Sequence, residues 1–185
     1  MKLWQKRVLT LSVVMWFILA SAGVFAVSNV TSKYFDHDAR LSMALMSLDF
    51  ESRLVNALTD PADSNGARIY HIRGVHSCFC EGLVQAHVKA LNALAADKLS
   101  VMNVQLEPSS ALASMVPSTP AVAVVDEDGD LAYFGPYSQG MGCFSRSGSI
   151  NTLIQNVADG LHSYQKVQNK TASIQAEASG CYCNQ

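Results

Sequence analysis

An uncharged run of 20 residues near the N-terminus limits the folds open to this chain more than any other feature. The run is VLTLSVVMWFILASAGVFAV, residues 8–27. As a helix it rises about 30 Å, which matches the apolar core of a bilayer. Lys2, Lys6 and Arg7 precede it, so the positive-inside rule leaves residues 1–7 in the cytoplasm and exports the remainder of the chain. We therefore predict a single transmembrane helix followed by a domain outside the cytoplasm.

A cleaved signal peptide is the alternative interpretation of the same run. The small-residue triplet VFA, residues 24–26, would serve as a cleavage site. The apolar region of a signal peptide is usually about 7–15 residues long, and this run is longer, so its length favours an uncleaved anchor. Both interpretations place the bulk of the chain outside the cytoplasm.

Charge and cysteine content narrow the classes of function. The 13 Lys and Arg residues against 15 Asp and Glu give a net charge of −2, which does not favour nucleic-acid binding. An exported address permits disulfides. The cysteines are odd in number, so we expect at least one to be free, shared with a partner or bound to a metal. These cysteines are Cys78, Cys80, Cys143, Cys181 and Cys183.

Hydrophobic periodicity and turn residues divide the exported part into alternating elements. A strand–helix–strand unit followed by a hairpin and a covering helix predicts a compact, layered α/β domain. The hairpin turns at Asp126–Asp130, which we interpret as turn chemistry. The expected elements are a helix over 34–58, a strand over 67–74, a helix over 81–98, strands over 99–106, 120–126 and 131–137, a helix over 149–167, and a loose polar tail over 168–185.

Cys78 and Cys80 stand where the helix over 81–98 is expected to begin. The positive end of the helix dipole stabilises a thiolate, which is both the nucleophile and the metal ligand. A disulfide within a Cys-x-Cys motif closes a small, strained ring, so we expect an oxidising, exchange-prone pair. The alternative is that the two cysteines are tied separately to Cys143 and to the tail in structural bridges.

Thr119-Pro120 stands at the start of a strand that would lie beside the cysteine strand. A proline can begin a strand but does not sit within a central one. A cis bond here would make a rigid turn that brings the Thr119 backbone next to the cysteines. An ordinary trans proline entering an edge strand is the alternative.

The order strand, cysteine pair, helix, strand, Thr-Pro, hairpin, helix resembles the thioredoxin-like fold, over residues 66–167. The resemblance implies a three-layer α/β/α fold with a central mixed sheet. It also implies that Cys78 and Cys80 are the active pair, and that Thr119 and a cis Pro120 hold the substrate strand. The motif Trp-Cys-Gly-Pro-Cys is absent, which departs from thioredoxin itself.

Three motifs, SCFCEGLVQAHV, STPAVAVVDEDGDLAYFGPYSQGMGC and the terminal GCYC, resemble more closely an uncharacterised proteobacterial family of membrane-anchored, thioredoxin-like proteins. That resemblance implies the bacterial inner membrane, with the C-terminal domain in the periplasm. The expected organisation is a cytoplasmic end (1–7), an anchor (8–27), a juxtamembrane helical segment (28–65), the thioredoxin-like domain (66–167) and a flexible tail (168–185).

Our first hypothesis is a membrane-tethered thiol–disulfide oxidoreductase without a cofactor. Cys78 would attack a partner disulfide, or the Cys78–Cys80 pair would accept electrons from a partner dithiol, and Cys80 would resolve the mixed disulfide. Thr119 and Pro120 would seat the substrate strand, and the partners would be thiols or disulfides of exported proteins. The candidate relay cysteines are Cys143, Cys181 and Cys183.

Two alternatives use the same cysteines differently. One is a soft-metal carrier, because thiolates select copper(I) or zinc. The other is a non-catalytic, thioredoxin-like interaction domain with structural disulfides, because a fold alone does not settle function. The candidate metal ligands are Cys78, Cys80, Cys181 and Cys183.

Overall fold

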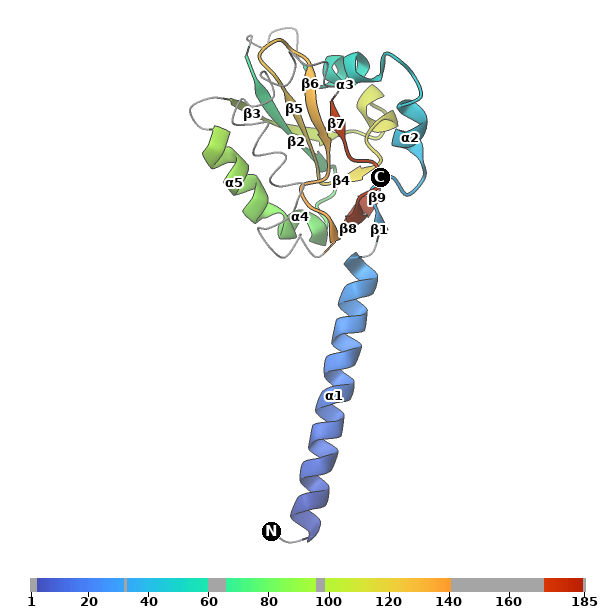
Figure 1. Cartoon of the computed structure of the whole chain (residues 1–185), viewed down its shortest axis with the longest axis vertical. Coiled ribbons are helices and arrows are strands. Elements are labelled where there is room, and N and C mark those ends of the chain that lie inside the picture. Colours follow the sequence, from blue (N-terminus) through green and yellow to red (C-terminus); the bar gives the residue numbers. More distant parts are fainter. Residues whose placement is uncertain (1–2, 32, 60–65, 96–98, 141–171, 185) are drawn as a thin grey trace.

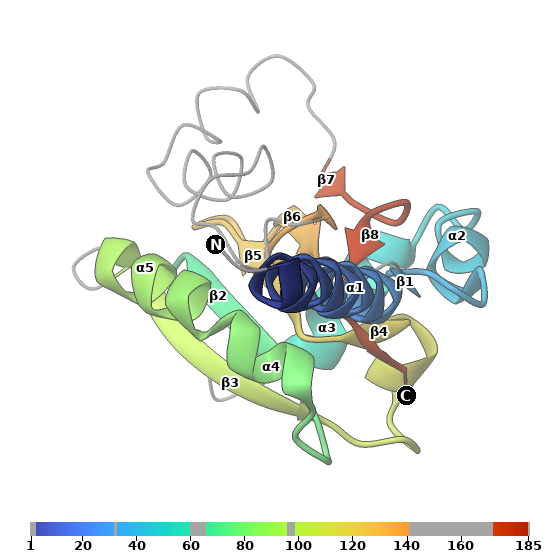
Figure 2. The ribbon, with the colours of Figure 1, turned by 90° about the horizontal axis from the view of Figure 1, so that it is seen from below.

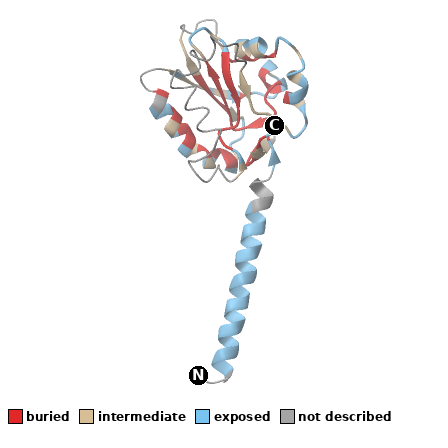
Figure 3. Cartoon of the chain, viewed as in Figure 1, coloured by how far each residue is buried: buried red, intermediate tan, exposed pale blue. Residues whose placement is uncertain are grey.

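The computed structural model describes residues 3–31, 33–59, 66–95, 99–140 and 172–184 (Figure 1). The first element is a long helix, α1 (Leu3–Thr31), that leaves the domain as an exposed rod. Its stretch Trp4–Val27 is long and apolar enough to cross a membrane, as the sequence predicts. Figure 3 shows the contrast between this exposed rod and the buried strands of the domain.

The domain is organised around a mixed five-stranded sheet with the strand order β3-β2-β5-β6-β7. β2 runs parallel to β3 and antiparallel to β5, β5 is antiparallel to β6, and β6 is parallel to β7. The β-branched and aromatic runs predicted as strands therefore form four strands of the sheet, within a residue or two of the expected bounds, and β7 joins them from the segment expected to be a tail. The strands are β2 (Arg68–Gly74), β3 (Ser100–Leu106), β5 (Ala121–Val125), β6 (Leu131–Gly135) and β7 (Ser173–Ile174).

Helices cover both faces of this sheet, which confirms the layered α/β prediction. The register aligns Tyr70, Ala123 and Phe134 on one face, where the Phe134 ring lies 6.4 Å from the Phe50 ring of α3 (Phe50–Leu58). His71 points to the other face and bonds to Asn92 of α5 (Gln85–Ala95). Figure 2 shows α4 (Phe79–Leu83) and α5 along one side of the domain and α2 (Arg40–Ala44) on the opposite side.

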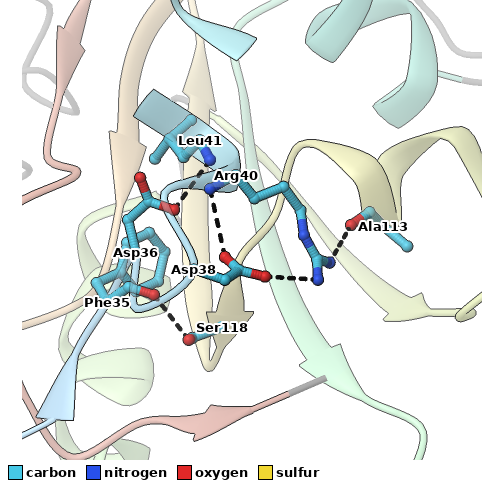
Figure 4. A network of polar contacts seen from close by, with 7 residues as sticks. All are labelled: Phe35, Asp36, Asp38, Arg40, Leu41, Ala113 and Ser118. Atoms are coloured by element: carbon cyan, nitrogen blue, oxygen red, sulfur yellow. Dashed lines mark hydrogen bonds and ion pairs between the residues drawn. The ribbon is translucent and has the colours of Figure 1, made fainter. Parts of the chain in front are cut away.

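The helix expected over 34–58 is wrong as a single element, because local side-chain bonds interrupt it. The Asp36 carboxylate accepts hydrogen bonds from the Leu41 and Ser42 amides and so starts α2 (Figure 4). The Ser47 hydroxyl donates to the Ala44 carbonyl at 2.8 Å and offers the chain a turn in place of continued helix. A second helix, α3, begins at Phe50.

This break changes which apolar residues are buried. A single helix over 34–58 would place Leu41, Leu45, Leu48, Val55 and Leu58 on one apolar stripe. Of these, Leu41 and Leu58 are buried, whereas Leu45 and Leu48 are exposed. The segment over 28–65 is thus more than a spacer, since its described part supplies core residues. They are Phe35, Leu41, Phe50, Leu54 and Leu58.

The helix expected over 81–98 begins earlier, at Phe79, and is divided at Val84 into α4 and α5. The hairpin turn is confirmed: the Asp126 amide donates to the Asp130 carbonyl at 2.9 Å, and Gly129 takes a φ of 84°. A short 3-10 turn, η1 (Ala111–Ser114), lies between β3 and β4. The helix expected over 149–167 lies outside the described residues.

The C-terminal segment 172–184 is built into the domain, which corrects the expectation of a loose tail. β7 extends the main sheet, β8 (Ser179–Gly180) pairs with β1 (Lys33–Tyr34), and β9 (Cys183–Asn184) pairs with β4 (Ser118–Thr119). Ala178, Cys181 and Tyr182 are buried. Two-residue strands carry no hydrophobic alternation, so the sequence pattern gave no sign of this docking.

Candidate functional site: two crossed Cys-x-Cys pairs

The first Cys-x-Cys motif lies at the C-terminal end of β2, where the chain turns into α4. Cys78 is the residue before the helix, with an extended backbone at φ −119° and ψ 166°, and Cys80 lies in the first turn. Cys78 is partly exposed and Cys80 is 6% exposed. The predicted position at the mouth of a helix is therefore correct, although the helix that follows is a short one.

The two Cys-x-Cys motifs are crossed by disulfides rather than closed within themselves. Cys78 is bonded to Cys183, with Cα atoms 6.5 Å apart, and Cys80 is bonded to Cys181, with Cα atoms 5.4 Å apart. This corrects the expectation of a Cys78–Cys80 disulfide. The alternative of separate bridges to Cys143 and to the tail is confirmed only for the tail, because both cysteines are bonded to tail cysteines and neither is left for Cys143. Cys143 itself lies outside the described residues.

The two disulfides differ in their access to solvent. Both sulfurs of the outer disulfide, Cys78–Cys183, belong to half-buried residues. The inner disulfide joins Cys80 to Cys181, which is 1% exposed. An external thiol therefore meets the outer disulfide first, because attack requires access to a sulfur atom.

Packing of one aromatic side chain fixes the tail between these disulfides. Tyr182 lies between Cys181 and Cys183, its ring meets the Phe35 ring edge-on at 5.3 Å, and its hydroxyl donates to the Ser138 carbonyl at 3.1 Å. A Cβ on Gly180 would come within 2.7 Å of the Tyr182 hydroxyl oxygen, so glycine makes this packing possible.

The post-anchor segment holds the same tail from the other side. The Phe35 amide donates to the Ala178 carbonyl at 2.8 Å, and the Phe35 carbonyl accepts from the Ser118 hydroxyl at 2.7 Å (Figure 4). Arg40 braces the same region by pairing with Asp38 and donating to the Ala113 carbonyl. The sequence DHD over 36–38 thus serves to start a helix and to pair charge.

The Thr119-Pro120 bond is cis, the isomer that the thioredoxin resemblance implies. Thr119 is fully buried, and the β4–β9 register places it opposite Cys183. The backbone of β4, just before Pro120, therefore pairs with this chain's own strand β9. We call this strand-binding position the slot at Pro120. Sequence reasoning named both partners of the slot but did not predict that they pair.

Buried polar groups of β2 and α4 were not predicted from the sequence. Glu81, 8% exposed, accepts a hydrogen bond from the Gly74 amide at 2.9 Å. His71 Nε2 donates to the Asn92 side-chain oxygen at 2.8 Å, and its Nδ1 accepts from the Tyr137 hydroxyl. Burial lowers the pKa of His71 and raises that of Tyr137, so both are neutral. The sequence signal that could have revealed these buried groups is His71, which stands between Tyr70 and Ile72 in a predicted strand.

The other two histidines of this region differ in burial. His87 is 3% exposed on α5, and His76 is exposed in the loop before Cys78. The sulfur atoms of Cys78, Cys80 and Cys183 lie within 4.8 Å of one another. With Cys181 bonded to Cys80, the four sulfurs form one compact cluster.

The chain belongs to a family described as a domain of unknown function, DUF6436, whose model matches residues 47–185. The match includes α3, the sheet, both Cys-x-Cys motifs and the docked tail. No curated protein is similar enough to the chain to count as a match.

Proposed function

We propose that this protein is a membrane-tethered thiol–disulfide exchange protein whose two Cys-x-Cys pairs form one redox centre. The observation that carries the proposal is the difference between the two crossed disulfides. The outer disulfide is accessible to an external thiol, and the inner disulfide lies directly behind it. A thiolate released from the outer disulfide can therefore attack the inner one.

The reaction can be written with atoms and electrons in balance. A thiolate of a partner dithiol attacks the Cys78 sulfur, forms a mixed disulfide and releases Cys183, which takes up a proton. The partner's second thiolate closes the partner's own disulfide and releases Cys78. The partner loses two electrons and the outer disulfide gains them.

The freed Cys78 thiolate can then attack Cys80 within the inner disulfide. This step forms Cys78–Cys80 and releases Cys181, with no net change in oxidation state. Cys80 is thus the sulfur attacked in this second step, and Cys181 and Cys183 remain together as a reduced pair on the tail. Thr119 and Pro120 would seat the strand of a partner that displaces β9, the β-augmentation mode of peptide recognition.

A thioredoxin-like fold and a periplasmic address belong to this proposal. The observed order β2, α4–α5, β3, cis-proline, β5–β6 hairpin is the order that the resemblance implies. The span Trp4–Val27 supports an anchor, and cationic residues before it favour export of the domain. We place the protein in the bacterial inner membrane on those grounds, with thiols or disulfides of exported proteins as its partners.

The test is a redox titration of the full chain in detergent micelles across glutathione buffers, with thiol trapping read by peptide mass. We expect Cys183 to become reducible first, a Cys78–Cys80 disulfide to appear as an intermediate, and a transition between about −120 and −270 mV. A Cys80→Ala variant, which cannot form that intermediate, is the matched control. Two disulfides that open only below about −300 mV would instead mark them as structural and contradict the proposal.

A second candidate function, soft-metal carriage, is favoured by the clustering of the sulfurs within 4.8 Å. After reduction, four thiolates of this kind suit tetrahedral zinc or copper(I). The reduced chain is expected to retain one metal equivalent after dialysis against zinc, and Cys181→Ser to lower that retention. A reduced chain that retains neither zinc nor copper(I) eliminates this candidate.

A further inference from the structure

We propose that the cysteine end of the domain docks on the surface of the bilayer, with the lipid headgroup layer as its binding partner. The inference rests on the anchor included in the proposed function, and it adds an interaction surface to it. The surface consists of Val75, Phe79 and Tyr34, which are 36%, 69% and 65% exposed.

Chain connectivity brings this surface close to the membrane. The apolar span ends at Val27, and α1 continues to Thr31, a further rise of about 6 Å. The step from Thr31 to Lys33, where β1 begins, adds at most about 7 Å. The domain is therefore attached within about 13 Å of the bilayer's apolar core.

The attachment point is also the point where the disulfides begin. Lys33 faces Gly180 across the β1–β8 pair, about 5 Å apart, and Cys181 follows Gly180 by about 4 Å. Even with the connection fully extended, Cys181 lies no more than about 22 Å from the apolar core. Headgroups fill about 5–8 Å of that distance. Figure 1 shows α4, β8 and β1 at the end of the domain from which α1 leaves.

Acidic side chains are most numerous at the hairpin turn, although Glu107 follows β3 and Glu177 precedes β8 near the cysteine end. The two segments that carry the bonded cysteines, 75–84 and 178–184, contain one acidic side chain, Glu81, and it is buried. The hairpin turn at the other end carries Asp126, Glu127, Asp128 and Asp130. The register fixes this separation, because Ile72 pairs with Ala121 at the cysteine end and Arg68 with Val125 at the turn.

The exposed side chains fit an interfacial location. Phe79 stands between the two cysteines of its motif. Among the described residues that follow β1, it is the most exposed aromatic residue. Tyr34 follows Lys33, and aromatic and cationic residues of this kind are enriched at the headgroup level. A headgroup layer would bury the Phe79 ring beside the outer disulfide.

The test places a tryptophan reporter at either end of the full-length protein in nanodiscs. In a background carrying Trp4→Phe and Trp16→Phe, one variant adds Phe79→Trp and a matched control adds Glu127→Trp at the acidic turn. Phosphatidylcholine with a nitroxide on its headgroup is the quencher. We expect the reporter at position 79 to lose at least twice as large a fraction of its fluorescence as the reporter at position 127.

Equal quenching at the two positions would overturn the docking. Peptide mapping of both disulfides in each variant verifies that the fold is retained. Extraction of the membranes with alkaline carbonate separates the two proposals: release of the chain contradicts the anchor, whereas an integral chain with an unquenched reporter at position 79 contradicts only the docking.

Discussion

Removal of one of the two disulfides is expected to destabilise the domain far less than removal of both, because they close almost the same loop. Cys80–Cys181 spans 101 residues and Cys78–Cys183 spans 105. In the chain-entropy description, the first disulfide to close a loop of this size contributes about 4.7 kcal/mol to the free energy of unfolding.

The second disulfide closes only the small ring that runs through the two motifs and the first bond. A ring of about six residues contributes roughly 2 kcal/mol in the same description. We therefore expect the double variant Cys78→Ser/Cys183→Ser to lose about 2 kcal/mol, since the inner disulfide still closes the long loop. Cys80→Ala/Cys181→Ala should lose somewhat more, because those two cysteines are buried. The chain that lacks both pairs should lose about 7 kcal/mol, a large part of the stability of an ordinary domain.

The assay is urea unfolding of the full chain in mild detergent, followed by far-UV circular dichroism, with a redox-inert buffer. With a slope of about 2 kcal/mol per molar urea, loss of one pair moves the midpoint by about 1 M. A loss of about 4.7 kcal/mol on removal of either pair alone, and twice that for both, would show that the bonds constrain separate loops. Such additivity would refute the nested arrangement and, with it, the inward transfer from the outer to the inner disulfide.

Three further predictions concern the surroundings of the site. Gly180→Ala should lower the free energy of unfolding by about 1–3 kcal/mol in the same urea assay, because its Cβ would overlap the Tyr182 ring; an unchanged midpoint would contradict the close packing. His71 is buried with a lowered pKa, so stability should be complete above the unfolded pKa of about 6.5 and fall below it, by at most about 1.4 kcal/mol per pH unit. Unfolding midpoints between pH 7 and 5 should fall less steeply in His71→Gln. Ala39→Gly should raise stability by up to about 1 kcal/mol, because Ala39 has a φ of 57°, and a lower midpoint would show that another contact holds this turn.

The strands of this domain could be predicted because their residues carry the information locally. ARIYHIRG and PAVAVVD are rich in β-branched and aromatic residues, and DEDGD between two such runs marks a turn. The helices were less predictable, because side chains such as Asp36 and Ser47 redirect the backbone at single positions. The spacing of apolar residues carries no information about such side-chain hydrogen bonds. It therefore assigned Leu45 and Leu48 to a core that they do not enter.

The cysteines were found as a set, but their pairing was not. The pairing depends on two-residue strands, β8 and β9, that meet partners far away in the sequence. Strands of that length have no period to detect, and a Cys-x-Cys motif has the same spacing whether it closes on itself or crosses to a second motif. The deciding contact is Tyr182 against Phe35, a long-range packing event between the tail and the segment that follows the anchor.

That contact also determines what happens to the tail once its disulfides open. Among the described residues, β9 is joined to β4 through two residue pairs, Ser118 with Asn184 and Thr119 with Cys183. Backbone hydrogen bonds of this kind contribute about 1 kcal/mol each, because water replaces them readily. Burial of an aromatic side chain such as Tyr182 contributes more, on the order of 2–3 kcal/mol. Reduction therefore does not by itself empty the slot at Pro120: a partner strand competes mainly with the burial of Tyr182, and the reduced tail remains close enough to return.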